Sequence, residues 1–431
     1  MTGCKPPDPA PDGFTGAILA VEGIRDAAVL LNGPTGCKFY HGAVSEGQLP
    51  RETSMDPLQF SEEFYFGQPR VPATYLDAQD YIFGATEKLS KMLPKVAEKG
   101  HRLIAVVNSP GAALIGDDLE RFIAGAGLPI PCVAIESTGF SDRFTRGFQR
   151  SVIQVLERLN PPAVPLQARL VNLIGLSIQH RHWEGDAAEL RRLLGLCGIG
   201  VNAVVCAGCT AAELRTMGAA KNVVVHAEYA DELSAFLEDR IETGMLVPEA
   251  GPPVGFSDTE AWIRSVCRAL KADPGPALAD IREARTRAFQ ALSRFNSLTG
   301  LPGGATFALH ADGSTALSLT RWLYEYLGMV PTAVSVSEAT EDQPAEIRRY
   351  LTRIGCADAW EADLSGLEPD LVFGGEGFIS LFRTEGMPVA GIDIALPGSG
   401  DVEVIPKCQL GATGALWLLE RILNGLLSGV G

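Results

Sequence analysis

The sequence has no run of about 18 apolar residues, no apolar segment near its first residue, and fewer basic than acidic residues. The polar, proline-rich start MTGCKPPDPAPDG is unlike a secretory signal, and no stretch is long enough to cross a membrane. Lys and Arg number 36 against 52 Asp and Glu, so the formal net charge is -16. Phosphate binding needs a basic surface, so this balance argues against a nucleic-acid partner. These absences predict a cytoplasmic protein.

Two common catalytic fingerprints are also missing. GPTGCKFY (33–40) superficially suggests a phosphate loop, but a P-loop continues from its second glycine into Lys and then Ser or Thr. Here Gly36 is followed by Cys37. The chain also has no G-x-S-x-G nucleophile elbow. The sequence therefore carries neither a nucleotide-binding fingerprint nor a nucleophile elbow.

Short apolar runs alternate with helical stretches along the chain. LIAVVNSP (103–110) and LPIPCVAIEST (128–138) are typical of buried strands, and FTRGFQRSVIQVLERL (144–159) of the helix that follows them. The same alternation returns from RLVNLIGLSI (169–178) and from ATFALHA (305–311) onward, and a long helix is expected over about 275–298. Strand, helix and strand in succession predict parallel βαβ units.

Glycine and proline mark two junctions between these blocks. They are NPPAVPLQA (160–168) and SLTGLPGG (297–304). A chain of 431 residues is long enough for two to three domains. We therefore expect three doubly wound, Rossmann-like α/β domains with parallel sheets, at 1–162, 163–300 and 301–431.

Two of the nine cysteines lie beside glycines in segments that read as loops. Cys4 is in GCKPP and Cys37 is in NGPTGCKFY. In open α/β domains ligands bind at loops beyond the carboxyl ends of strands, and thiolates are the preferred ligands of iron–sulfur clusters. Two thiolates do not complete a four-cysteine site, so a partner chain, a serine or a carboxylate must supply the rest. The alternative is a glycine-rich turn with a buried thiol.

Two further pairs have structural explanations. Cys206 and Cys209 form C-A-G-C at the end of a predicted strand, which is half of a zinc site at most. Buried core thiols are the favoured interpretation. His180 and His182 would lie on one side of a strand end if the strand continued through them. A surface or core pair is favoured for these histidines.

Ordered segments across nearly the whole chain resemble the nitrogenase component 1 family. The segments are GCKPP (3–7), GAILAVEGIRDAAVLLNGPTGCKFYHG (16–42), DYIFGATEKL (80–89), VVNSPGAALIGDDL (106–119), GIGVNAVVCAGCTAAEL (198–214), GMPVAGIDIALPG (386–398) and QLGATGALWLLERILN (409–424). The last two are similar to the C-terminus of the family's β-type chain. The resemblance implies the nitrogenase component 1 fold.

The resemblance also assigns site residues. Cys4 and Cys37 match the first two cluster cysteines of the family, and Ser109 stands where the third would be. Ser141 lies near the place of a β-type serine that binds cluster iron on oxidation. Phe83 matches an aromatic between the cluster and the docking face of the reductase.

Two departures from the family pattern bear on function. Asn32 replaces the usual histidine before the second cluster cysteine. Ala227 stands where the α-type subunit has the cysteine that holds the catalytic cofactor, and PVAGID (388–393) has no histidine where that subunit has one. The resemblance therefore implies a non-catalytic, β-type role.

The implied assembly is an α₂β₂ complex with an α-type nitrogenase-like subunit. An ATP-hydrolysing, homodimeric iron–sulfur reductase would deliver electrons to a P-cluster-like iron–sulfur cluster, 4Fe–4S or 8Fe–7S, shared between the subunits. We expect the reaction of a methylthio-alkane reductase, which cleaves carbon–sulfur bonds. The alternatives are a nitrogenase molybdenum–iron protein β subunit, a cofactor-assembly scaffold, and a cluster-free α/β partner protein.

Overall fold

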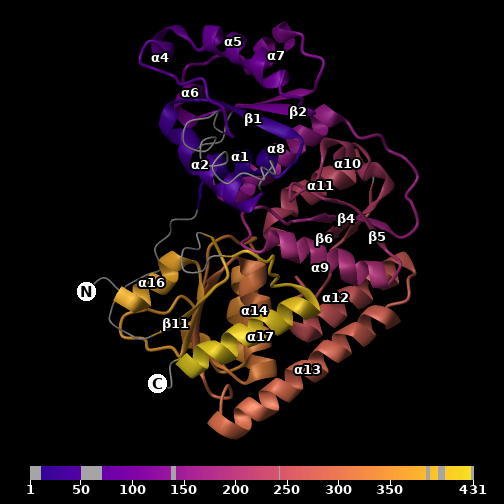
Figure 1. The fold of residues 1–431 in the computed structure, drawn as a ribbon, viewed down its shortest axis with the longest axis vertical. Coiled ribbons are helices and arrows are strands. Elements are labelled where there is room, and N and C mark those ends of the chain that lie inside the picture. Colours follow the sequence, from indigo (N-terminus) through magenta and orange to yellow (C-terminus); the bar gives the residue numbers. More distant parts are fainter. Residues whose placement is uncertain are drawn as a thin grey trace.

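The computed structural model describes residues 11–49, 70–136, 142–241, 243–384, 389–396 and 403–428. This part of the chain contains three parallel sheets surrounded by helices, which confirms the predicted fold class (Figure 1). Each sheet falls within one of the three predicted domain ranges, although the domain boundaries stay a prediction. Across the described residues, no helix is long and apolar enough to cross a membrane.

The first sheet has the strand order β1-β2-β3. Its strands are β1 (Ala27–Asn32), β2 (Leu103–Asn108) and β3 (Cys132–Ile135). Around it lie α1 (Gly13–Glu22), α2 (Thr35–Gln48), α4 (Asp80–Phe83), α5 (Thr86–Ala97), α6 (Pro110–Ala113), α7 (Leu119–Ala126) and α8 (Phe144–Leu159). Val29 and Leu31 pack with the helices α1 and α8, whereas Ala28 and Leu30 pack with α5 and α7. Both faces of the sheet are covered, which is why its strands are apolar throughout.

Helices α1 and α8 meet backbone to backbone. A Cβ atom on Gly147 would lie 1.9 Å from the carbonyl oxygen of Gly13, and one on Gly16 would lie 2.2 Å from that of Phe144. Real Cβ atoms do not approach so closely, so only glycine permits this crossing. The two helices thereby join the start of the first sheet to the segment that leaves it.

The second sheet has the order β5-β4-β6-β7. Its strands are β4 (Leu170–Ile174), β5 (Gly200–Val204), β6 (Lys221–Val224) and β7 (Met245–Leu246). Its helices are α9 (Trp183–Leu196), α10 (Ala211–Arg215), α11 (Asp231–Arg240) and the 3-10 turns η1 (Met217–Ala219) and η2 (Ala227–Tyr229). The short β7 is the last strand on one edge, whereas β5 lies on the other.

The third sheet has the order β11-β10-β8-β9. Its strands are β8 (Thr306–Ala311), β9 (Val330–Val336), β10 (Leu371–Gly374) and β11 (Ala390–Asp393). The helices that accompany it are α14 (Gly313–Leu327), α15 (Gln343–Arg353), α16 (Glu376–Thr384) and α17 (Gly411–Ser428), with the 3-10 turn η3 (Ala357–Ala359).

Two helices connect the second and third sheets, and the last helix returns to them. These connecting helices are α12 (Gly255–Leu270) and the long α13 (Gly275–Thr299), which runs along one edge of the molecule (Figure 1). Helix α17 packs against α9, α12 and α13. Asp186 stabilises the segment just before α17, because its carboxylate accepts hydrogen bonds from the backbone N–H groups of Gln409 at 2.7 Å and Leu410 at 2.9 Å.

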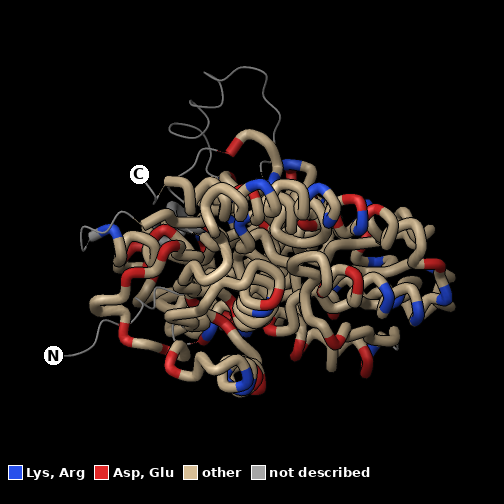
Figure 2. Tube along the Cα trace, turned by 90° about the horizontal axis from the view of Figure 1, so that it is seen from below, with Lys and Arg blue, Asp and Glu red and all other residues tan. Residues whose placement is uncertain are grey.

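Charged residues are spread along the described chain. Figure 2 shows Lys and Arg residues interspersed with Asp and Glu residues. Many of the basic side chains have acidic partners, such as Arg192 with Asp280 at 2.8 Å. The acidic balance of the sequence is therefore distributed over the fold.

Candidate functional site

The segments that carry two predicted cluster residues, Cys37 and Ser109, leave the same carboxyl edge of the first sheet. Strands β1 and β2 are parallel neighbours, and their last residues Asn32 and Asn108 are register partners. Helix α2 begins three residues after β1 and helix α6 begins two residues after β2. Cys37 therefore lies in the first turn of α2, and Ser109 is the N-cap residue of α6. The side chain of Cys37, and all of Cys4 and Ser141, lie outside the described part of the chain.

Ser109 is used by the fold as a helix cap. It is 2% exposed, and its Oγ accepts the backbone N–H of Ala112 at 3.2 Å. Its own backbone N–H donates to the carbonyl oxygen of Asn32 at 2.9 Å. This geometry accounts for a serine at the position without any metal, because serine is a preferred N-cap residue. A role for Ser109 in binding iron stays a prediction.

The start of α2 suits an anionic iron–sulfur cluster. Pro34 is the N-cap residue of this 14-residue helix and makes no side-chain hydrogen bond to its first N–H groups. The positive end of the helix dipole favours thiolate and a negatively charged cluster. Among the residues that the structure describes, none has an atom within 4 Å of a Cβ atom built on Gly36. Within the described ranges, no group of three or more His, Cys, Asp or Glu side chains could hold a metal ion.

The predicted docking residue lies on an exposed apolar surface. Phe83 is the last residue of α4 and is 84% exposed. Ile82 beside it and Leu114 after α6 are exposed as well. Helices α4 and α6 lie at the end of the molecule remote from the third sheet (Figure 1). This arrangement is compatible with a docking face, and the docking role of Phe83 stays a prediction.

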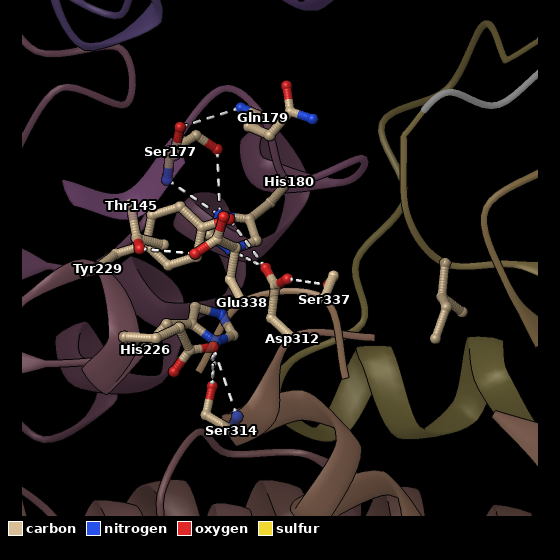
Figure 3. A network of polar contacts seen from close by, with 12 residues as sticks. Thr145, Ser177, Gln179, His180, His226, Tyr229, Asp312, Ser314, Ser337 and Glu338 are labelled. Atoms are coloured by element: carbon tan, nitrogen blue, oxygen red, sulfur yellow. Dashed lines mark hydrogen bonds and ion pairs between the residues drawn. The ribbon is translucent and has the colours of Figure 1, made fainter. Parts of the chain in front are cut away.

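A second polar site lies where loops of the second and third sheets meet the start of α8 (Figure 3). On one side of it, the hydroxyl of Ser314 donates to Glu228 at 2.8 Å and lies 2.9 Å from Nδ1 of His226. Gln343 donates to the second oxygen of Glu228 at 3.0 Å. Glu228 is 2% exposed. Its carboxyl group therefore joins the second and third sheets through hydrogen bonds from neutral donors.

On the other side of this polar site, the carboxyl groups of Asp312 and Glu338 accept the hydrogen bonds. Asp312 accepts hydrogen bonds from the hydroxyls of Tyr229 at 2.8 Å and Ser337 at 2.5 Å. Glu338 accepts the hydroxyl of Thr145 at 2.8 Å, which connects the third sheet to helix α8. Residues from all three parts of the chain thus meet in one buried network (Figure 3). No sequence motif indicated it.

Burial changes the protonation of this network. The pKa of Glu228 is raised from 4.5 to about 7, first by burial and then by the charge of Asp312. The pKa of Tyr229 is raised by burial and the same aspartate, and burial lowers the pKa of His226. Glu228 is therefore protonated in the folded chain at a pH where it is ionised in the unfolded chain.

Glu228→Gln should reduce the loss of stability as pH rises from 5 to 8. The folded pKa of Glu228 is raised, so its contribution is complete below pH 4.5 and is lost as pH passes about 7. A neutral glutamine has no such dependence, so the stability difference between wild type and variant should change by roughly 2 kcal/mol over this range. Thermal midpoints at pH 5.5 and pH 8 measure it. Glu157→Gln on the exposed side of α8 is the control, and equal pH dependence in all three proteins would contradict the assignment.

Cys206, Cys209 and His182 are buried, whereas His180 is half-buried. The expectation that alternation along a strand would place both histidines on one side was wrong. Strand β4 ends at Ile174, and residues 178–182 form turns. His180 consequently stacks on His226 with ring centroids 4.5 Å apart, whereas His182 packs against Trp417 at 4.7 Å. The histidines therefore belong to different environments.

Cys206 and Cys209 are fully buried, as the core interpretation expected. Cys206 has a left-handed backbone, with φ of 54°, and its N–H donates to Sγ of Cys209 at 3.2 Å. Arg25 donates its backbone N–H to the carbonyl oxygen of Cys209 at 2.8 Å. The pair thus forms a tight turn that joins the first and second sheets.

The chain is a multidomain α/β protein with three parallel sheets. Its candidate cluster site is at the edge of the first sheet, where helix α2 bears the cysteine Cys37. The family model described as "Nitrogenase component 1 type Oxidoreductase" matches residues 13–427, and the chain belongs to this family. Family membership makes it an oxidoreductase-family chain of a kind that normally binds iron–sulfur clusters and acts in complexes with partner subunits.

Named relatives narrow the type of chain within the family. It is 28% identical to the B subunit of the light-independent protochlorophyllide reductase of Methylobacterium sp. (strain 4-46), over 84% of this chain and 72% of the relative. It is 26% identical to the protein of the same name from Synechococcus sp. (strain WH7803), over 90% of this chain and 76% of the relative. Both relatives are B subunits of a light-independent protochlorophyllide reductase.

A solved structure matches the fold over the whole chain. "Nitrogenase Cp1 at pH 6.5" has a TM-score of 0.76 and 18% identity, and the match covers 100% of this chain and 94% of that one. The fold resemblance expected from the sequence is confirmed. The relatives named above are subunits of protochlorophyllide reductases and not of the expected methylthio-alkane reductase, and the reaction of this chain stays a proposal.

Proposed function

We propose that this chain is the β-type subunit of a nitrogenase-like reductase and helps to hold an iron–sulfur cluster at its interface with an α-type subunit. The observation that carries the proposal is the placement of Cys37 in the uncapped first turn of α2, at the carboxyl edge of the first sheet. Cys4 would be the second thiolate from this chain. The cluster, when bound, supplies one-electron transfer.

The contribution of the chain is to bind, orient and shield. Residue Cys37 would bind iron as a thiolate, favoured by the N-terminus of α2. Ser109 fixes the start of the neighbouring helix α6 through its cap. The far end of α2 is held by Trp183, whose indole N–H donates to the carbonyl oxygen of Gln48 at 2.8 Å. Helix α2 is therefore braced on the second domain while its first turn faces the proposed cluster.

The residues of this chain do not fit the catalytic cofactor. Ala227 offers no ligand at the position that the resemblance identifies. The flanking side chains of His226 and Glu228 are engaged with Ser314. We therefore assign the catalytic centre to the α-type partner and the relay role to this chain, acting in the cytoplasm as an α₂β₂ complex.

The reductase partner would dock at the first domain. The apolar surface of Phe83, Ile82 and Leu114 is the candidate contact, since exposed apolar side chains gathered at one end of a domain mark interaction sites. ATP hydrolysis belongs to that reductase, in agreement with the missing P-loop of this sequence.

Two substrates are candidates. The names of the relatives favour the reduction of protochlorophyllide. The sequence resemblance favoured methylthio-alkanes, because Ser109 and Asn32 depart from nitrogenase proper and the protochlorophyllide reductase chains differ in the cluster loop. The two reactions need different substrate pockets in the α-type partner.

One assay separates these candidates. The chain is produced with its α-type partner and the reductase without oxygen, and the complex is supplied with ATP and either substrate. Reduction of protochlorophyllide or release of a thiol from a methylthio-alkane identifies the reaction and supports the enzyme role. If ATP is consumed but neither product forms while a cofactor precursor accumulates on the complex, the chain is an assembly scaffold, and the proposed reductase function is wrong.

A further inference from the structure

A chain of buried amide and hydroxyl groups joins the loops at the edge of the first sheet. Asn32 is fully buried and Asn108 is 3% exposed. The Nδ2 group of Asn32 donates to Oδ1 of Asn108 at 2.8 Å. Because these two residues end neighbouring parallel strands, this bond fixes the separation of the strands where the loops to α2 and α6 depart.

Thr74 extends the chain of hydrogen bonds to the segment beside β1. Its hydroxyl donates to Oδ1 of Asn32 at 2.8 Å and accepts the backbone N–H of Gly33 at 3.1 Å. The carbonyl oxygen of Gly33 in turn accepts the N–H of Leu76 at 3.1 Å. The backbone N–H and the carbonyl oxygen of Gly33, two residues before α2, are therefore both held by hydrogen bonds.

The two loops are also pressed against each other. A Cβ atom on Gly33 would lie 2.9 Å from Cβ and Oγ of Ser109. Only glycine permits this contact. The backbone N–H of Ser109 also donates a hydrogen bond to the carbonyl oxygen of Asn32, which holds the two segments together. The path from β1 to Cys37 covers only Gly33–Gly36, so a change in Asn32 is transmitted to the thiolate over a short, fixed segment.

The second sheet contains the same pairing without a ligand loop. Asn172 and Asn222 are register partners, and Nδ2 of Asn172 donates to Oδ1 of Asn222 at 2.9 Å. Asn172 lies in the middle of β4, two residues before its end. Asparagine pairs are thus a way in which this protein joins adjacent parallel strands, and the pair in the first sheet differs by its position at the strand ends.

We infer that Asn32, supported by Thr74 and Asn108, is a positioning residue that sets the distance between Ser109 and the start of helix α2, which bears Cys37, around the cluster. The inference rests on the proposed function, because it assumes that Cys37 binds a cluster. Hydrogen bonds behind the metal ligands orient them, and their loss typically costs about 10–100-fold in metal affinity. The polar partners left behind would be buried and unsatisfied, which loosens both loops.

The test compares Asn32→Leu and Asn172→Leu in the complex produced without oxygen. The readouts are the electron paramagnetic resonance spectrum of the cluster, its reduction potential, and the rate at which a chelator removes iron. Asn172→Leu should lower the thermal midpoint and leave all three cluster readouts unchanged. Asn32→Leu should shift the potential and the spectrum, and should speed iron release roughly tenfold.

Two further variants keep the test decisive. Thr74→Val removes one hydroxyl at nearly constant volume, so it replaces Asn32→Leu if that variant fails to fold, and it should shift the same readouts in the same direction. Asn32→His keeps a ring donor and a ring acceptor and should restore the wild-type release rate in part. If Asn32→Leu or Thr74→Val matches Asn172→Leu in the cluster readouts, the positioning role is wrong. If the wild-type complex contains no cluster, the proposed function fails instead.

Discussion

Replacing Cys37 by Ala should remove nearly all iron and acid-labile sulfide from the complex and abolish the resonance signal of its cluster. Of the two proposed cysteine ligands, Cys37 is the one whose backbone the structure describes, in the first turn of α2. Alanine supplies no ligand, and iron–sulfur clusters are held by cysteine thiolates, so the cluster loses one of the bonds that retain it. Iron and sulfide analysis of the purified complex, with the resonance spectrum, measures the loss.

Cys356→Ala is the matched control for this prediction. Cys356 is a half-buried thiol of the third domain, and it makes a weak hydrogen bond to the carbonyl oxygen of Ile354 at 3.8 Å. The control should retain the full cluster signal. If both variants kept their iron, Cys37 would be an ordinary residue of a glycine-rich turn, and the cluster would have to be bound elsewhere.

Gly147→Ala should destabilise the chain strongly, although it adds only one methyl group. Its Cβ atom would lie 1.9 Å from the carbonyl oxygen and 2.5 Å from the Cα of Gly13, which are backbone atoms that cannot rotate away. The helices α1 and α8 would have to separate, and the packing of Phe14 and Phe148 between them would be lost. Overpacking of this kind costs about 3 kcal/mol or more.

The control for that variant is a glycine with free space. Gly195 is a helical residue of α9, and a Cβ atom there would meet nothing within 4 Å. Gly195→Ala should therefore stabilise the chain by about 0.5–1 kcal/mol, the ordinary gain of alanine over glycine in a helix. Thermal unfolding of both variants measures the contrast. A Gly147→Ala protein as stable as Gly195→Ala would contradict the backbone contact between α1 and α8.

The regular elements were predictable where the apolar period was clear. Helix α8 occupies Phe144–Leu159, the range predicted from its pattern, and α13 ends within one residue of the prediction. Strand β1 was not identified, because α1 and β1 follow each other within one apolar stretch separated only by a short turn. Helix α12 was not identified either, since it begins at Gly255 with φ of 71°, shortly after a proline pair that reads as a loop.

The candidate site was predictable only where a local motif exists. Cys37 follows a glycine-rich loop that can be read from the sequence, and its family resemblance identified it. The network around Glu228 joins residues far apart along the chain, such as Ser314, which is 86 positions away. Such contacts arise when the carboxyl edges of separate sheets meet, and no local pattern encodes them. The partners of Asn32 escaped notice for the same reason, since Thr74 is 42 positions away.

The most direct test of the central claim is the iron and acid-labile sulfide content of this chain, produced without oxygen, both alone and together with its α-type partner. A cluster shared across an interface is complete only in the assembled state, so metal binding and association are coupled. We predict iron and sulfide in the complex, little of either in the separate chain, and a separate chain that aggregates in analytical ultracentrifugation. A stable monomer carrying a full cluster, or a complex free of iron, would contradict the assignment of this chain as a cluster-sharing β-type subunit.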